Sequence, residues 1–264
     1  MLLLTASEFY HTSIRIQSPA MNHVARIDRR QMAAPQVYRY LHGQIVSGEL
    51  RPGHALSENA VAEQLNVSRT PVREAFIRLA NEGLIRVFPQ VGTRVSSISL
   101  AAVADSQFLR ESIECRTIAE AARRATASDR TELQRIIERQ RECVRAQDGK
   151  GFFPLDEEMH QYLLAMGERQ RLWRVLSDAK SQLDRVRHLS LEDPHWLRKV
   201  FKEHEFIVRR VLANDEAGAV EAMQTHLRSV FDAVQKIAAA NHEYFSDEDW
   251  PWHRAPRGTS SPRT

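Results

Sequence analysis

Four residues in the C-terminal half of the chain have the types and spacing of a metal site. Asp156 and His160 lie four residues apart in DEEMH, so a helix would direct both side chains toward one point. His204 and His226 follow on two later segments, each among apolar residues typical of a helix face that points into a core. Three imidazoles and one carboxylate could hold zinc, manganese, nickel or iron. From spacing alone, the alternative is a set of hydrogen-bonded histidines in an ordinary core.

Residues 67–75 (VSRTPVREA) combine guanidinium groups with the start of a helix. Ser68 and Thr70 are both favourable N-cap residues. The apolar stripe of the helix that follows leaves Arg69 and Arg73 off the buried face, at the N-terminal end. Guanidinium groups in that position could contact guanine edges and phosphates of DNA.

The neighbouring segments predict a winged helix-turn-helix. Residues 58–65 form a short predicted helix that Ser57 can cap, and residues 66–67 make the turn. Residues 84–87 and 93–95 predict the two strands of a hairpin. In this arrangement the second helix enters the major groove of DNA. The alternative is a small helical hairpin with a purely structural role.

The same region resembles the DNA-binding domain of GntR-family bacterial transcriptional regulators, through GELRPG at 48–53, LSE at 56–58 and VSRTPVREA at 67–75. In that family arginine usually follows the residue equivalent to Glu58, whereas this chain has asparagine, which cannot pair with guanine as a bidentate donor. The resemblance implies a homodimer on a palindromic operator in double-stranded DNA. The DNA-binding residues that it implies are Ser57, Asn59, Ser68, Arg69, Thr70, Arg73, Gly92 and Thr93.

The second half of the chain resembles the FCD subgroup of that family, which includes FadR-like regulators. The Asp-x-x-x-His pair and two later histidines match the residues by which the subgroup commonly binds a divalent metal. The resemblance therefore implies that one divalent ion is bound by Asp156, His160, His204 and His226. Zinc is the expected ion, with manganese, nickel and iron as alternatives.

The segment FLRESIE at 108–114 carries a further resemblance. Arg110 takes the place of an arginine that the family offers to an organic-acid effector, and Glu114, one turn later, could orient it. Arg185 and Arg187 are further candidate partners for a carboxylate. The alternative interpretation of Arg110 is an ordinary surface charge.

Composition sets broad limits on the protein. Its 264 residues, 42% hydrophobic and 27% charged, suit one large or two small globular domains. The formal net charge of +3 permits DNA binding without requiring it, and no lysine precedes Lys150, so the fixed positive charge of the N-terminal half is arginine. Cys115 and Cys143 form no CxxC pair, and no apolar run is long enough to span a membrane. We therefore expect a cytoplasmic protein without membrane contact.

The pattern divides the chain into four parts. Residues 1–33 predict a flexible arm, 34–96 the winged domain, 100–240 an all-helical effector-binding and dimerisation domain, and 241–264 a disordered tail, in which Trp250 and Trp252 could dock onto the bundle. Six helices are expected in the third part, the second capped by Ser128, at residues 100–127, 129–147, 152–166, 168–191, 195–213 and 215–240. Short connections favour an antiparallel bundle. The predicted fold is mainly α, a winged helix-turn-helix followed by an FCD-like bundle.

Three functions are compatible with these features. The first is a metabolite-responsive transcriptional regulator, in which a small carboxylate near the metal changes operator binding. The second is a metal-dependent hydrolase built on the bundle, and the third is a DNA-binding protein without an effector. The winged helix favours a regulator over an enzyme. The signal would cross the linker at residues 96–99, because the helix that begins at Leu100 also carries Arg110.

Overall fold

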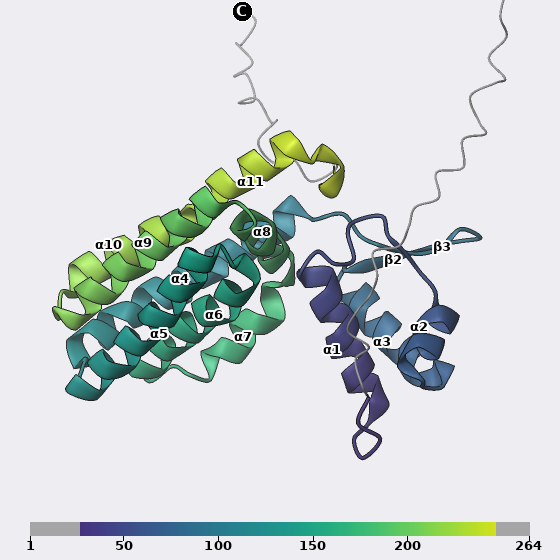
Figure 1. The fold of residues 1–264 in the computed structure, drawn as a ribbon, viewed down its shortest axis with the longest axis horizontal. Helices are drawn as coiled ribbons and strands as arrows, with labels where there is room; N and C mark the ends of the chain where they lie inside the picture. The colour runs from purple at the N-terminus through teal and green to yellow at the C-terminus, as the bar shows by residue number, and fades with distance from the viewer. Residues whose placement is uncertain (1–26, 247–264) are drawn as a thin grey trace, which may run out of the picture.

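The computed structural model describes residues 27–246, which form two domains with separate hydrophobic cores (Figure 1). Residues 1–26 and 247–264 lie outside the described part, and with them most of the predicted arm, Trp250 and Trp252. The described chain is mainly α, with a winged helix-turn-helix before a helical bundle, as the sequence predicts. None of its helices combines the length and apolar character needed to cross a bilayer.

The N-terminal domain contains three helices and a three-stranded antiparallel sheet of order β1-β3-β2. Strands β2 and β3 form the predicted wing, in which Phe88 lies opposite Gly92. The two-residue strand β1 is absent from the sequence prediction because so short a segment offers no alternation to detect. The elements of this domain are α1 (Ala33–Val46), β1 (Ala55–Leu56), α2 (Glu58–Leu65), α3 (Arg69–Asn81), β2 (Ile85–Phe88) and β3 (Gly92–Val95).

The turn between α2 and α3 follows from local chemistry. The Ser57 hydroxyl accepts the Ala60 N–H at 3.5 Å and so caps α2. Asn66 ends α2 with a φ of 51°, a left-handed conformation that asparagine tolerates and that turns the chain sharply. Ser68 precedes α3, but the expected side-chain cap is wrong, because no side chain accepts a hydrogen bond at that helix start. Burial of the apolar stripe that includes Val72 holds α3 in place instead.

The C-terminal domain contains eight α-helices among the described residues, not the six that the sequence predicts. The predicted segments 168–191 and 215–240 are each divided, one at Lys180 and the other at Ser229. Neither break carries glycine or proline, so no local signal marks it. The helices are α4 (Leu100–Arg124), α5 (Ala127–Ala146), α6 (Gly149–Met166), α7 (Leu172–Ala179), α8 (Ser181–Leu191), α9 (Pro194–Leu212), α10 (Glu216–Arg228) and α11 (Val230–Ala240).

Two helix starts in this domain differ from the prediction. Helix α5 is capped by Thr126, not Ser128, because Thr126 and Asp129 form a reciprocal capping box. Helix α6 begins at Gly149 because the Asp148 side chain accepts the Gly151 N–H at 2.8 Å. Asp148 therefore starts α6, whereas the sequence suggested that it closes the preceding helix.

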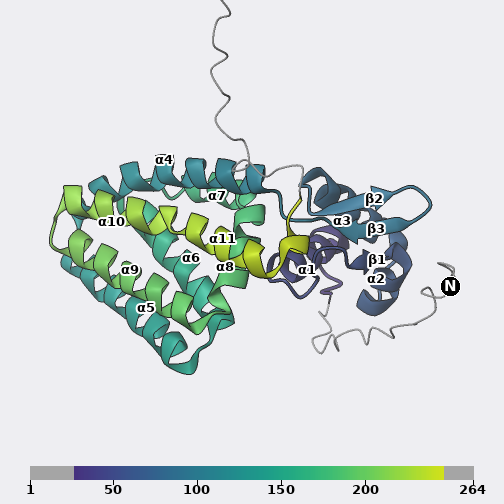
Figure 2. The ribbon, with the colours of Figure 1, turned by 90° about the horizontal axis from the view of Figure 1, so that it is seen from above.

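The bundle is antiparallel, and α4 packs along α10 while α5 packs along α6 and α9 (Figure 2). Its core joins apolar side chains from every one of the long helices. In both views α8 and α11 lie at the end of the bundle that faces the winged domain. These two helices are therefore the ones placed to meet it.

The prediction of a disordered tail is wrong for residues 241–246, the first six of that segment. After α11, His242–Tyr244 form a 3-10 helix (η1), and Phe245 makes a parallel bridge with Ile98. Tyr244 is 8% exposed and Phe245 6% exposed, so both belong to the core of the bundle. Their apolar burial offsets the entropy of ordering the segment.

Candidate metal site and DNA-binding surface

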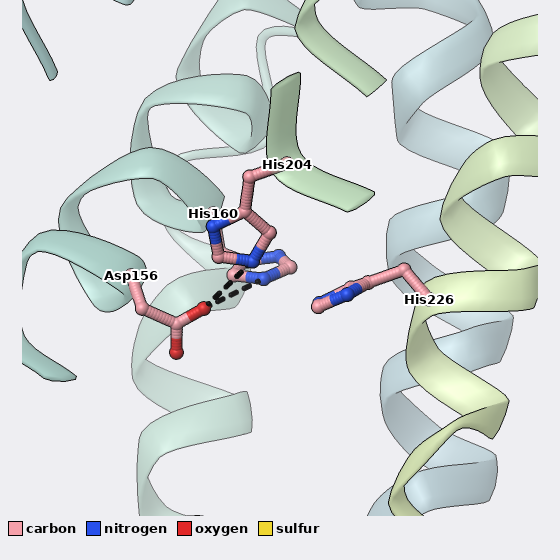
Figure 3. A group of neighbouring side chains, drawn as sticks. All are labelled: Asp156, His160, His204 and His226. Carbon is pink, nitrogen blue, oxygen red and sulfur yellow. Dashed lines mark ion pairs between the residues drawn. The ribbon is translucent and has the colours of Figure 1, made fainter. Parts of the chain in front are cut away.

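The predicted metal ligands meet at one place in the core of the bundle (Figure 3). Asp156 and His160 come from α6, His204 from α9 and His226 from α10. One ligand atom from each lies within 4.8 Å of the others, and all four side chains are buried. The helical spacing on α6 thus brings Asp156 and His160 together, as the sequence suggested. The packing of α9 and α10 against α6 adds His204 and His226.

Each imidazole is held through Nδ1 by a residue of another helix. His160 Nδ1 contacts Glu114 at 2.5 Å, and His226 Nδ1 contacts Glu203 at 2.9 Å. Because a carboxylate only accepts hydrogen bonds, both Nδ1 atoms carry the proton. In the neutral form of either ring, the lone pair is then on Nε2, where it is available to a metal ion.

Gln140 fixes the third ring. Its amide N–H donates to the Leu155 carbonyl at 3.0 Å, so its amide oxygen faces His204 Nδ1 at 2.9 Å. His204 thus donates through Nδ1 and turns the Nε2 lone pair to the cluster. Burial, followed by repulsion from the neighbouring imidazoles, lowers the pKa of His204 and of His226 well below the ordinary value, so both are neutral at pH 7.

The donor set fits a divalent ion. The Nε2 atoms of His160 and His204 are buried and have no hydrogen-bond partner within residues 27–246. They nevertheless lie 3.5 and 3.1 Å from the same oxygen of Asp156. Lone pairs that face one another at such distances repel unless a cation lies between them. Three imidazoles and one carboxylate are ligands that zinc, manganese, nickel and iron accept.

Two arginines border this cluster. Arg187 of α8 pairs with the second oxygen of Asp156 and also with Glu157 and Asp184. Arg110 Nε donates to Glu114 at 2.7 Å, as the sequence suggested. Burial alone would raise the pKa of Glu114, but the charge of Arg110 and the hydrogen bond from His160 lower it, so the carboxylate is ionised. Glu114 thereby links the predicted effector arginine to a metal-facing histidine.

A small cavity of about 40 Å³ opens beside the cluster. Its polar lining comes from Arg110, Asp156, Arg187, Ser190, His226 and Ser229. Two guanidinium groups next to a metal ligand suit a small anion. Arg110 is 4% exposed, so the interpretation of it as a surface charge is wrong.

Arg185 is not part of this cavity. Its guanidinium donates to the backbone carbonyls of Ser96 at 2.8 Å and Ser97 at 3.4 Å. The structure therefore does not bring Arg185 together with Arg110. Arg187 lies in the position beside Arg110 that the sequence suggested for Arg185. The reason is the helical period, since residues two apart on α8 point to different sides.

The predicted DNA-contacting residues lie at the start of α2, at the start of α3 and at the tip of the wing. Arg69 forms a 3.5 Å ion pair with Glu58, and its side chain is 68% exposed. Gly92 has a φ of 109°, which closes the wing in a conformation that side chains rarely adopt. Thr93 is half-buried. The exposed members are Ser57, Asn59, Ser68, Arg69, Thr70, Arg73 and Gly92.

Sequence reasoning missed the residues that orient the imidazoles. Gln140 did carry a signal, because it is a polar residue in the apolar stripe that contains Leu133 and Ile136. Glu203 carried none, because its partner His226 lies on a different helix. Contacts between helices are not encoded in local spacing.

Comparison with known proteins decides the family. Residues 33–95 match the family described as bacterial regulatory proteins, gntR family, and residues 105–229 match the FCD domain. The HTH-type transcriptional repressor RspR of Escherichia coli K12 is 34% identical over 223 residues, which cover 84% of this chain and 98% of RspR. The chain belongs to the GntR family of transcriptional regulators. Its helical half is an FCD domain.

Further relatives of this GntR-family protein support the same assignment. An HTH-type transcriptional regulator from an unstable DNA locus of Streptomyces ambofaciens is 39% identical over 212 residues, 80% of this chain and 89% of that protein. The solved structure of E. coli McbR/YncC shares the fold, with a TM-score of 0.66 at 22% identity over 78% of this chain and 99% of that one. These relatives are transcriptional regulators, not enzymes, so the hydrolase alternative is wrong.

Proposed function

We propose that this GntR-family protein is a metabolite-responsive regulator whose effector is a small carboxylate. The acid would bind in the cavity beside Asp156 and change the affinity of the winged domain for its operator. The observation that carries the proposal is the combination of three lone pairs turned to one point with two guanidinium groups at its border. RspR is described as a repressor, and we propose repression here as well.

Asp156, His160, His204 and His226 would hold the metal ion, which supplies a Lewis-acidic anchor for one carboxylate oxygen. The protein supplies the rest of the binding energy. Arg110, held by Glu114, and Arg187 would donate N–H groups to the remaining acid oxygens. Because the cavity is small and both arginines are buried, the site favours a compact acid over an extended one.

On the DNA side, Arg69 and Arg73 would enter the major groove and Gly92 and Thr93 would contact phosphate or the minor groove. We propose a homodimer on a palindromic operator, in the cytoplasm. Two exposed apolar side chains support a second copy as partner: Phe108 of α4 is 75% exposed and Val175 of α7 is 49% exposed. Helices α4 and α7 are in contact, so the two residues lie on neighbouring elements.

The proposal is tested by a thermal-shift screen of small mono- and dicarboxylic acids, with and without chelator. An acid at one hundred times its dissociation constant should stabilise the protein by about 2.7 kcal/mol, and chelation should abolish the shift. The active acid is then titrated in an operator-binding assay. An acid that stabilises the protein but leaves operator affinity unchanged would reduce the function to DNA binding without an effector.

A further inference from the structure

The linker between the two domains is held from two sides. It runs from the end of β3 through residues 96–99 to the start of α4. Ile98 is fully buried in the core of the bundle. A four-residue linker without contacts of its own would leave the winged domain freer to reorient. The contacts that hold the linker therefore help to fix the orientation of that domain.

The first contact comes from α8. The Arg185 guanidinium donates to the carbonyls of Ser96 and Ser97, and its side chain is 3% exposed. Burial lowers its pKa to about 10, which leaves it charged at neutral pH. Arg185 forms no ion pair with a carboxylate of residues 27–246. A buried charge is costly unless it is hydrogen-bonded, so the linker carbonyls and Gln182 are what satisfy it.

The second contact comes from the segment after α11. The Ile98 N–H donates to the Tyr244 carbonyl at 2.7 Å, and the Ser246 N–H donates to the Ile98 carbonyl at 3.3 Å. The Tyr244 hydroxyl in turn accepts from Arg51 of the winged domain at 3.1 Å. Residues 241–246 thus join α11, the linker and the winged domain. They lie beyond the FCD match, which ends at residue 229.

Both contacts are made by residues of, or next to, helices that line the cavity beside Asp156. Helix α8 contributes Arg187 and Ser190 to the cavity, and Arg185 is two residues from the first of these. Helix α11 contributes Val230 and Ala233 and continues into residues 241–246. The route through α8 and α11 is separate from the route through α4 that the sequence suggests.

We propose that Arg185 and residues 241–246 form a linker clamp that fixes the orientation of the winged domain on the bundle and so sets operator affinity. With the clamp closed, the two recognition helices of a dimer are presented at a fixed spacing. With either side released, the winged domains sample many orientations, and binding must pay for ordering them. The clamp is a property of the protein alone and requires no effector.

The test measures the distance between the domains by double electron–electron resonance. Spin labels are placed at Glu63→Cys on α2 and Arg145→Cys on α5, with Cys115→Ser and Cys143→Ser, and labelled chains are diluted with unlabelled protein. Two matched pairs of variants are compared. A chain that ends at Ala240 is compared with one that ends at Ser246, and Arg185→Ala with the exposed Arg209→Ala.

We expect one narrow distance in the wild type and in both controls, and a distribution about twofold wider in the chain ending at Ala240 and in Arg185→Ala. Operator affinity of these two variants should fall by about tenfold. Cooperative melting and unchanged circular dichroism confirm folding. If the shorter chain does not melt cooperatively, Arg51→Ala replaces it, since this change removes only the side-chain contact with Tyr244.

A distribution as narrow as that of the wild type in either variant would overturn the clamp. This measurement uses neither effector nor metal. Failure of the carboxylate screen would therefore leave the clamp standing, and a broad distribution in the wild type would reject the clamp without affecting the acid site.

Discussion

At the scale of single residues, the candidate metal site depends on side chains that are not among its four proposed ligands. Gln140 is the clearest example, because its amide is fixed by the Leu155 carbonyl and in turn fixes the ring of His204. Without it, the imidazole of His204 could rotate or change tautomer. Loss of a hydrogen-bond partner of this kind typically lowers metal affinity by about 10- to 100-fold.

We therefore predict that Gln140→Leu lowers the affinity for zinc by about 10- to 100-fold. Competition with a chromogenic chelator measures the affinity. Gln134→Leu, an exposed position on the same helix, is the matched control and should bind zinc like the wild type. Equal affinities for all three proteins would mean that His204 is not a ligand or that Gln140 does not orient it.

On the predicted DNA-binding surface, Arg73 is exposed near the start of α3, where its guanidinium is accessible to DNA. We predict that Arg73→Ala weakens operator binding by about 1–3 kcal/mol, because a guanidinium contact with a base edge or phosphate is lost. Fluorescence anisotropy with an operator duplex gives the affinity. Arg145→Ala, exposed on α5, is the control, and a similar loss in both variants would point to non-specific charge instead.

At the scale of elements, α6 and α8 are held together by charge and by ring contact. Lys180, at the break before α8, pairs with Glu157 of α6 and with Asp184 of α8, both at 2.5 Å. Eight residues later, His188 stacks on Phe153 with ring centroids 3.8 Å apart. Burial, followed by the charges of Arg187 and Lys180, lowers the pKa of His188 to about 4.

This packing predicts how stability depends on pH. The folded pKa of His188 is about 4 and the ordinary value is 6.5, so between these values the unfolded chain binds more protons. Stability therefore falls as pH drops from 6.5 toward 4, by at most about 3 kcal/mol from this residue. His188→Phe should remove that part of the slope in urea unfolding, whereas His195→Phe, at an exposed position, should retain it. Parallel slopes for all three would contradict the assignment.

The sequence predicts the site better than it predicts the elements. Asp156 and His160 could be paired because helical spacing determines their geometry, and the winged helix could be recognised from local turns. The breaks at Lys180 and Ser229 could not, because a buried ammonium and packing between helices determine them. Residues 241–246 were expected to be disordered, because nothing local shows that Tyr244 and Phe245 meet Ile98, almost 150 residues earlier in the chain.

At the scale of the whole molecule, the proposed homodimer predicts a contact between copies that includes Phe108. We predict that Phe108→Glu weakens the dimer by at least about tenfold, because a charge would replace an aromatic anchor at the contact between copies. Sedimentation velocity over a concentration series measures the dissociation constant. Phe206→Glu, a partly exposed position on α9, is the control. A dimer of unchanged strength in Phe108→Glu would place the contact elsewhere on the protein.

The linker clamp also has a consequence for synthesis on the ribosome. The winged domain leaves the ribosome first and can fold on its own core, because domains generally fold as units from the N-terminus. The proposed clamp closes only after residues 241–246 emerge, that is, after every described helix of the bundle has been synthesised. A nascent or prematurely ended chain would therefore carry a folded winged domain without a fixed orientation.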